Sequence, residues 1–146
     1  MDFVTVHNIL YYIYTGCVNL HVPLNGPKYI TPPEGYPDEA DPFRLYRSAD
    51  KFLLHDLKGH CFHYIKAATG DDPRKAIQWL FDYNCGHHDE LREHCLGRVL
   101  ARYDELKESE EWRKVVLNEE DVPPSVRQYQ ERILYEISMR LTHRDS

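Results

Sequence analysis

Two stretches of the sequence are rich in the side chains that bind zinc. Their histidines and cysteines are His55, His60, Cys61 and His63, followed by Cys85, His87, His88, His94 and Cys95. Thiolate and imidazole are the protein ligands that zinc prefers, so a tetrahedral site is chemically possible. Structural zinc sites, however, usually contain a close cysteine pair or a close histidine pair that brackets a loop, and no close cysteine pair occurs here. We therefore expect no metal ligands and no cofactor, and we keep a small zinc-binding protein as the alternative function.

Cys85 lies in a short turn next to His87, where imidazoles could lower the pKa of the thiol and make it a nucleophile. Neighbours within one turn rarely form a catalytic pair, however, and no loop suited to stabilise an oxyanion is recognisable. Phosphate-binding, dinucleotide-binding, metalloprotease and serine-hydrolase motifs are also missing from the sequence. We expect no catalytic residue, and hence no enzyme.

The aromatic residues favour contacts with other proteins. Both faces of the N-terminal helix carry tyrosines, so some of them must point outward, and Tyr and Trp are enriched among the residues that dominate binding energy at interfaces. We predict Tyr12 and Trp79 as protein-binding residues. The competing interpretation is that large aromatics at helical spacing are simply core.

The N-terminal segment predicts a helix followed by one short strand. The apolar residues of the helix recur at steps of three, four and three along one face; they are Phe3, Val6, Leu10 and Ile13. Thr15-Gly16 should end it, because Gly readily takes the left-handed conformation that closes helices. Cys17 to Val22 then alternates, with Val18, Leu20 and Val22 on one side, which is typical of a strand.

A proline-rich segment over residues 23–42 should contain no regular element, and we expect it to be mobile and removable at small cost. Further amphipathic helices follow, with starts at Asp41-Pro42, Asp72-Pro73 and Ser125. Their apolar faces are Leu45, Ala49, Phe52 and Leu53; Leu57, Cys61, Tyr64, Ile65 and Ala68; Ala76, Ile77, Leu80 and Phe81; Leu91, Cys95 and Val99; and Val126, Tyr129, Ile133, Ile137 and Leu141. The fold class is mainly α, made of helical hairpins with one short strand.

Charge and composition argue against two classes of partner, nucleic acids and membranes. The 146 residues carry a net charge of -6 without a compensating Lys/Arg cluster, which argues against nucleic acid. The longest apolar run, Ile9 to Tyr14, is too short for a membrane span, and the N-terminus lacks the pattern of a signal peptide. We expect no membrane partner, reduced cysteines, and a cytoplasmic or nuclear location.

Two landmarks together resemble the second half of a BTB/POZ domain. The first is Val6 to Val18 with its Ile13-Tyr14-Thr15-Gly16 turn, and the second is the helix pair from Leu45 to Lys58. Ala76 to Val116 is similar to the opening helices of a BACK extension. The implied organisation is a C-terminal part of a BTB/POZ-like domain at 1–70, with the proline-rich insertion at 23–42, and BACK-like helices at 71–117. The resemblance ends there, and the residue pattern alone predicts a linker and an amphipathic helix at 118–146.

The resemblance implies a protein-interaction adaptor that self-associates and, as is common in the family, docks on a cullin-type ubiquitin ligase scaffold. The strands and helices that open the family's domain would lie before Met1. Without them, the apolar face of the N-terminal helix loses its cover, and exposed apolar patches of that size usually mark interfaces. We therefore expect the chain to pair with itself through this face.

Overall fold

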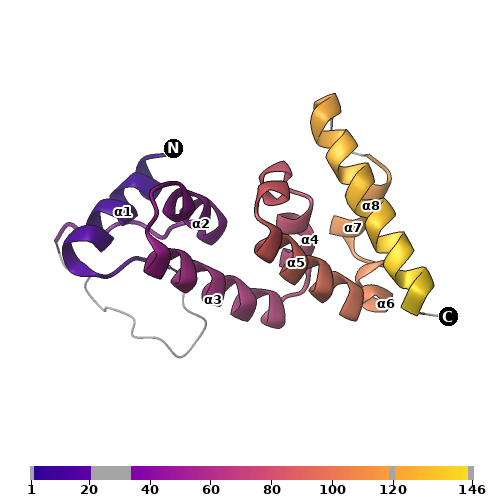
Figure 1. Cartoon of the computed structure of the whole chain (residues 1–146), viewed down its shortest axis with the longest axis horizontal. Helices are drawn as coiled ribbons and strands as arrows, with labels where there is room; N and C mark the ends of the chain where they lie inside the picture. Colours follow the sequence, from indigo (N-terminus) through magenta and orange to yellow (C-terminus); the bar gives the residue numbers. More distant parts are fainter. Residues whose placement is uncertain (1, 21–33, 119–120, 145–146) are drawn as a thin grey trace. The chain divides into compact units, whose positions relative to one another are not determined.

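The computed structural model describes residues 2–20, 34–118 and 121–144, and every regular element within them is a helix (Figure 1). This confirms the prediction of a mainly α protein. The chain divides into two compact units, residues 1–67 and 68–146. No helix in the described part of the chain is both long and apolar enough to span a bilayer.

The first unit contains α1 (Phe3–Thr15), α2 (Pro42–Lys51) and most of α3 (His55–Asp71). The expected end of α1 at Gly16 and the expected start of α2 at Asp41-Pro42 are confirmed, because they depend on neighbouring residues alone. The Asp41 carboxylate accepts hydrogen bonds from the first backbone N–H groups of α2, and Gly16 ends α1 in the left-handed conformation at φ 76°. The fully buried hydrophobic side chains of this unit are Leu45, Tyr46, Ala49, Leu57, Cys61 and Ile65.

The short strand expected at residues 17–22 is absent from its described part. Cys17 to Leu20 have no regular structure, and His21 and Val22 lie outside the described residues. The backbone N–H of Asn19 donates to the Asn8 side chain at 2.8 Å, and the Asn19 carbonyl accepts from Ala40 at 2.8 Å. Alternation of apolar residues predicts a strand only where a second strand pairs with it, and here the backbone bonds to a helix side chain and a loop instead.

Residues 34–41, the described end of the proline-rich segment, are attached to the first unit by hydrogen bonds. The Asn8 side chain donates to the Asp38 carbonyl at 2.9 Å, and the Asn19 side chain donates to the Pro37 carbonyl at 2.9 Å. Pro37 and Ala40 are buried. These contacts count against removal at small cost for residues 34–41, and the expectation for residues 23–42 stays a prediction. Residues 23–33 lie outside the described residues.

The second unit contains the end of α3, then α4 (Arg74–Leu80), the 3-10 helix η1 (Tyr83–His87), α5 (Asp89–Ala101), α6 (Tyr103–Leu106), α7 (Glu110–Val116) and α8 (Pro124–Arg144). Helices α4 and α5 pack on each other, and α8 packs on α5 and η1 (Figure 1). The core of this unit is Ala76, Ile77, Leu80, Leu91, Cys95, Leu96, Val99, Tyr129, Ile133 and Ile137. Helix α8 begins at Pro124, so Ser125 lies inside the helix and not at the predicted capping position.

The expected apolar face of α2 is wrong at its C-terminal end. Leu45 and Ala49 are buried, but Phe52 is 50% exposed and Leu53 is 72% exposed. The reason is that α2 ends at Lys51 and Leu53 takes the left-handed conformation with φ 57°. The chain leaves the helix there, so helical spacing no longer determines which side chains face the core.

Leu53 gives a first testable prediction. A left-handed conformation costs a residue with a Cβ about 1–2 kcal/mol, which glycine avoids. Because the side chain is mostly exposed, Leu53→Gly should stabilise the protein by about 0.5–1 kcal/mol after the added chain entropy of glycine is subtracted. Urea denaturation followed by circular dichroism measures this. Leu53→Ala keeps the strained backbone and should not stabilise, so equal gains in both variants would contradict the explanation.

Candidate protein-binding surface

Helix α1 turns its large apolar side chains away from its own unit. These side chains, which we call the α1 apolar face, are Phe3, Val6, Leu10, Ile13 and Tyr14. Phe3 is 77% exposed, Leu10 50% and Ile13 58%. The buried residues of α1 are Thr5, Asn8 and Ile9, so two of the three are polar. An ordinary amphipathic helix buries its apolar stripe, whereas α1 leaves its longest apolar stripe exposed.

Buried polar side chains fix this orientation of α1. Asn8 is 0% exposed, and its amide donates to the Val4 carbonyl at 3.0 Å and to the Asp38 carbonyl at 2.9 Å. Its oxygen accepts from the Asn19 N–H at 2.8 Å. Thr5 is also buried and donates to the Asp2 carboxylate. Buried polar groups are costly without partners, so rolling α1 to bury its apolar face would break these bonds.

The α1 apolar face carries no formal charge. No Asp, Glu, Lys or Arg occurs from Phe3 to Thr15, although 29% of the whole chain is charged. The spacing from Phe3 to Ile13 is that of the a and d positions of a heptad, which form the seam between paired helices. An uncharged apolar seam of this kind is suited to another apolar helix and not to water.

The two predicted binding residues lie in different units. Tyr12 is on α1 and Trp79 is on α4, and each is partly exposed. Neither unit holds both residues, so neither brings them together. The larger exposed set on α1 includes Tyr14, which the prediction did not select. The signal that points to this set is the combination of a helical apolar stripe with the absence of charge along the whole helix.

Three of the four cysteines are unsuited to nucleophilic chemistry, whereas Cys17 is exposed. Cys61, Cys85 and Cys95 are buried. Burial raises the pKa of Cys61 and Cys85 to about 12 and raises the pKa of Cys95 further. The hypothesis that nearby imidazoles lower the pKa of Cys85 is therefore wrong, because desolvation dominates.

The zinc alternative lacks a ligand set in the part of the chain that the structure describes. There, no three His, Cys, Asp or Glu side chains are grouped closely enough to hold a metal ion. The histidines have other neighbours: His94 Nε2 lies 2.9 Å from the Thr69 hydroxyl, and the His87 ring packs edge-on against Tyr83.

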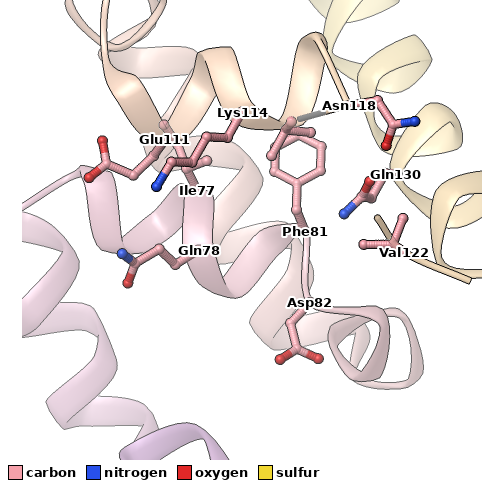
Figure 2. A pocket seen from close by; sticks show the side chains of 10 residues that line it. Ile77, Gln78, Phe81, Asp82, Glu111, Lys114, Asn118, Val122 and Gln130 are labelled. Carbon is pink, nitrogen blue, oxygen red and sulfur yellow. The ribbon is translucent and has the colours of Figure 1, made fainter. Parts of the chain in front are cut away.

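A cavity of about 280 Å³ lies between α4, α7 and the start of α8 (Figure 2). Figure 2 shows Phe81 near its middle, with Glu111 at the upper left and Asp82 at the bottom, so these carboxylates are well separated. Lys114 Nζ lies 3.6 Å from the Glu110 carboxylate. No Ser, Cys or His is among the described residues that line this cavity.

Comparisons with models of protein families, with curated proteins and with solved structures find no match to this chain.

Proposed function

We propose that this chain is a protein-interaction module that associates with a second copy of itself through the α1 apolar face. The observation that carries the proposal is that face: five large apolar side chains exposed on a helix without formal charges. In this proposal the chain makes and breaks no bond and needs no cofactor. Its activity consists of covering the apolar surface of a partner.

A second copy is the occupant that fits the α1 apolar face best. Two copies of an uncharged helix meet without like-charge repulsion, and heptad spacing lets each seam pack into the other. Burial of these side chains favours association by about 25 cal/mol per Å² of apolar surface, and the part of this gain that exceeds the entropy cost of association appears as affinity.

The resemblance to BTB/POZ proteins supports the same proposal. In that family, the helix similar to α1 precedes a strand, and the domain serves self-association and docking on a cullin-type ubiquitin ligase scaffold. We therefore propose an adaptor related to these proteins, with a BTB/POZ-like part at 1–70 and BACK-like helices at 71–117. A cytoplasmic or nuclear location belongs to the proposal, because the free cysteines suit a reducing compartment.

Sedimentation velocity at micromolar concentration tests the proposal. The unmodified chain should form a dimer or larger species. Leu10→Glu should weaken association at least tenfold, equivalent to about 1.4 kcal/mol, because it places a carboxylate in the apolar seam.

Met139→Glu is the matched control, since Met139 on α8 is 41% exposed and lies outside α1. It should associate as the unmodified chain does. A monomeric unmodified chain, or equal effects of Leu10→Glu and Met139→Glu, would refute self-association through α1.

A further inference from the structure

A second hollow, separate from α1, lies within the second unit between η1 and the first turns of α8. Its volume is about 630 Å³, within the usual range of about 300–1,000 Å³ for pockets that take small ligands or a few side chains. Tyr83 and His87 come from η1, and Gln128, Tyr129 and Arg132 come from α8. We call this hollow the η1–α8 groove.

Aromatic contacts hold the walls of the η1–α8 groove in place. The Tyr83 ring packs edge-on against His87, with centroids 5.8 Å apart, and against Tyr129, with centroids 5.9 Å apart. The Tyr129 hydroxyl donates to the Leu80 carbonyl at 2.8 Å, which fixes that ring. Tyr83 itself is 43% exposed. The groove therefore presents a rigid aromatic surface to solvent, and rigid aromatics lose little conformational entropy on binding.

Arg132 supplies an available positive charge beside this aromatic surface. Its guanidinium carbon lies 5.6 Å from the centre of the Tyr129 ring, which positions the side chain. Within the described part of the chain, Arg132 forms no ion pair, whereas Arg127 pairs with Glu131 and Arg140 pairs with Glu93 and Glu136. The planar fork of N–H donors on Arg132 is thus left for an external carboxylate.

The charge around the η1–α8 groove also differs from that of the whole protein. The chain has 24 acidic and 18 basic residues, yet no Asp or Glu is among the described residues that line this groove. The Figure 2 cavity, in contrast, has Asp82 and Glu111 in its lining. The net negative charge of the chain repels anionic partners, but Arg132 gives this groove a local positive charge. Such electrostatic complementarity favours an anionic partner at this site.

We propose that the η1–α8 groove binds an acidic peptide segment of another protein. A Glu or Asp side chain of the segment pairs with Arg132, and an adjacent apolar side chain packs against the exposed Tyr83 and His87 rings, behind which Tyr129 is buried. Gln128 and Ser125 at the rim offer an amide and a hydroxyl to the peptide backbone. This partner differs in chemistry from the apolar partner of α1, so the groove is a second binding site of the module.

Fluorescence anisotropy with short labelled peptides tests this proposal. The probes share Ser/Gly flanks and differ in their centres, which are Glu-Phe-Glu, Gln-Phe-Gln and Lys-Phe-Lys. We expect only the Glu-Phe-Glu peptide to bind. Arg132→Gln should weaken that binding at least tenfold. Arg132→Lys should weaken it several-fold, because lysine keeps the positive charge but lacks the planar N–H donors of the guanidinium group. Arg98→Gln, at an exposed arginine of α5, is the control and should leave binding unchanged.

Several results would overturn the proposal: no binding of the Glu-Phe-Glu peptide, equal binding of the Gln-Phe-Gln peptide, or equal losses in Arg132→Gln and Arg98→Gln. A single-stranded oligonucleotide that binds as tightly through Arg132 would show a general anion site. Tryptophan fluorescence on denaturation checks that each variant is folded, since both Trp79 and Trp112 lie in the same unit as the groove. Leu10→Glu should retain peptide binding, which separates this proposal from self-association through α1.

Discussion

Asn8→Asp should destabilise the protein by about 3 kcal/mol at neutral pH, because the substitution leaves a buried charge uncompensated. The size and shape of the side chain hardly change. The amide nitrogen, however, now donates to two carbonyls, those of Val4 and Asp38. A carboxylate oxygen at that place is repelled by both carbonyls, and the buried site lacks the water that would solvate it.

The destabilisation by Asn8→Asp should depend on pH. Burial beside two carbonyls favours the protonated acid, so the folded-state pKa of the introduced carboxyl lies above its unfolded value. A raised folded pKa gives stability that is present at low pH and lost as the pH rises through that pKa. The stability difference from the unmodified protein should therefore shrink in acid, where the acid group again donates one hydrogen bond.

Urea denaturation at several pH values, followed by circular dichroism, measures the effect of Asn8→Asp. Hydrogen exchange localises it, since backbone amides of α1 and of residues 34–41 should exchange faster. Asn118→Asp introduces the same charge at an exposed residue and should change stability by less than about 0.5 kcal/mol. Equal and pH-independent effects at the two positions would show that the bonds of Asn8 do not hold α1.

Asn8 also shows where prediction from the sequence stops. The periodicity of Phe3, Val6, Leu10 and Ile13 correctly predicts a helix, because spacing along one chain determines that these residues share a face. It does not determine which way that face points. The direction depends on carbonyls and N–H groups as far away as Asp38, 30 residues along the chain. The resemblance to a family supplied the expectation that this face lacks cover.

Other predictions from the sequence also succeed where the cause is local and fail where it is distant along the chain. Asp41 and Pro42 start α2 as predicted because capping involves only the next residues. The strand at Cys17 to Leu20 fails because pairing needs a distant partner. The η1–α8 groove could not be predicted from the spacing of residues, since His87 and Arg132 line one groove only after α8 packs on η1.

Gly86→Ala and Gly97→Ala should have opposite effects, although the substitution is the same. A Cβ at Gly86 would lie 2.9 Å from Cε2 of Tyr129, which is closer than two carbons normally approach. The Tyr129 ring cannot move aside freely, because its hydroxyl bonds to Leu80 and its ring packs against Tyr83. Overpacking of this kind costs about 1–3 kcal/mol, so we expect Gly86→Ala to destabilise by about 2 kcal/mol.

A Cβ at Gly97 meets nothing within 4 Å, and Gly97 lies in the middle of α5. Alanine is favoured over glycine inside a helix by about 1 kcal/mol, so Gly97→Ala should stabilise by about that amount. Urea denaturation followed by tryptophan fluorescence suits both variants, because both tryptophans lie in the same unit as these glycines. Stabilisation by Gly86→Ala would contradict the close packing of η1 on α8.

A double-mutant cycle connects the cost of Gly86→Ala to Tyr129 itself. Tyr129→Leu alone should destabilise by about 3 kcal/mol, because it opens a cavity and leaves the Leu80 carbonyl without its donor. In that background the added methyl group of Gly86→Ala enters space that the ring has left. The double variant should therefore be destabilised by about 1–2 kcal/mol less than the sum of the two single variants. A coupling of this size is typical of residues in direct contact. Simple additivity would show that the methyl group at position 86 does not meet the Tyr129 ring, and the wall of the η1–α8 groove would then be less rigid than its aromatic contacts imply.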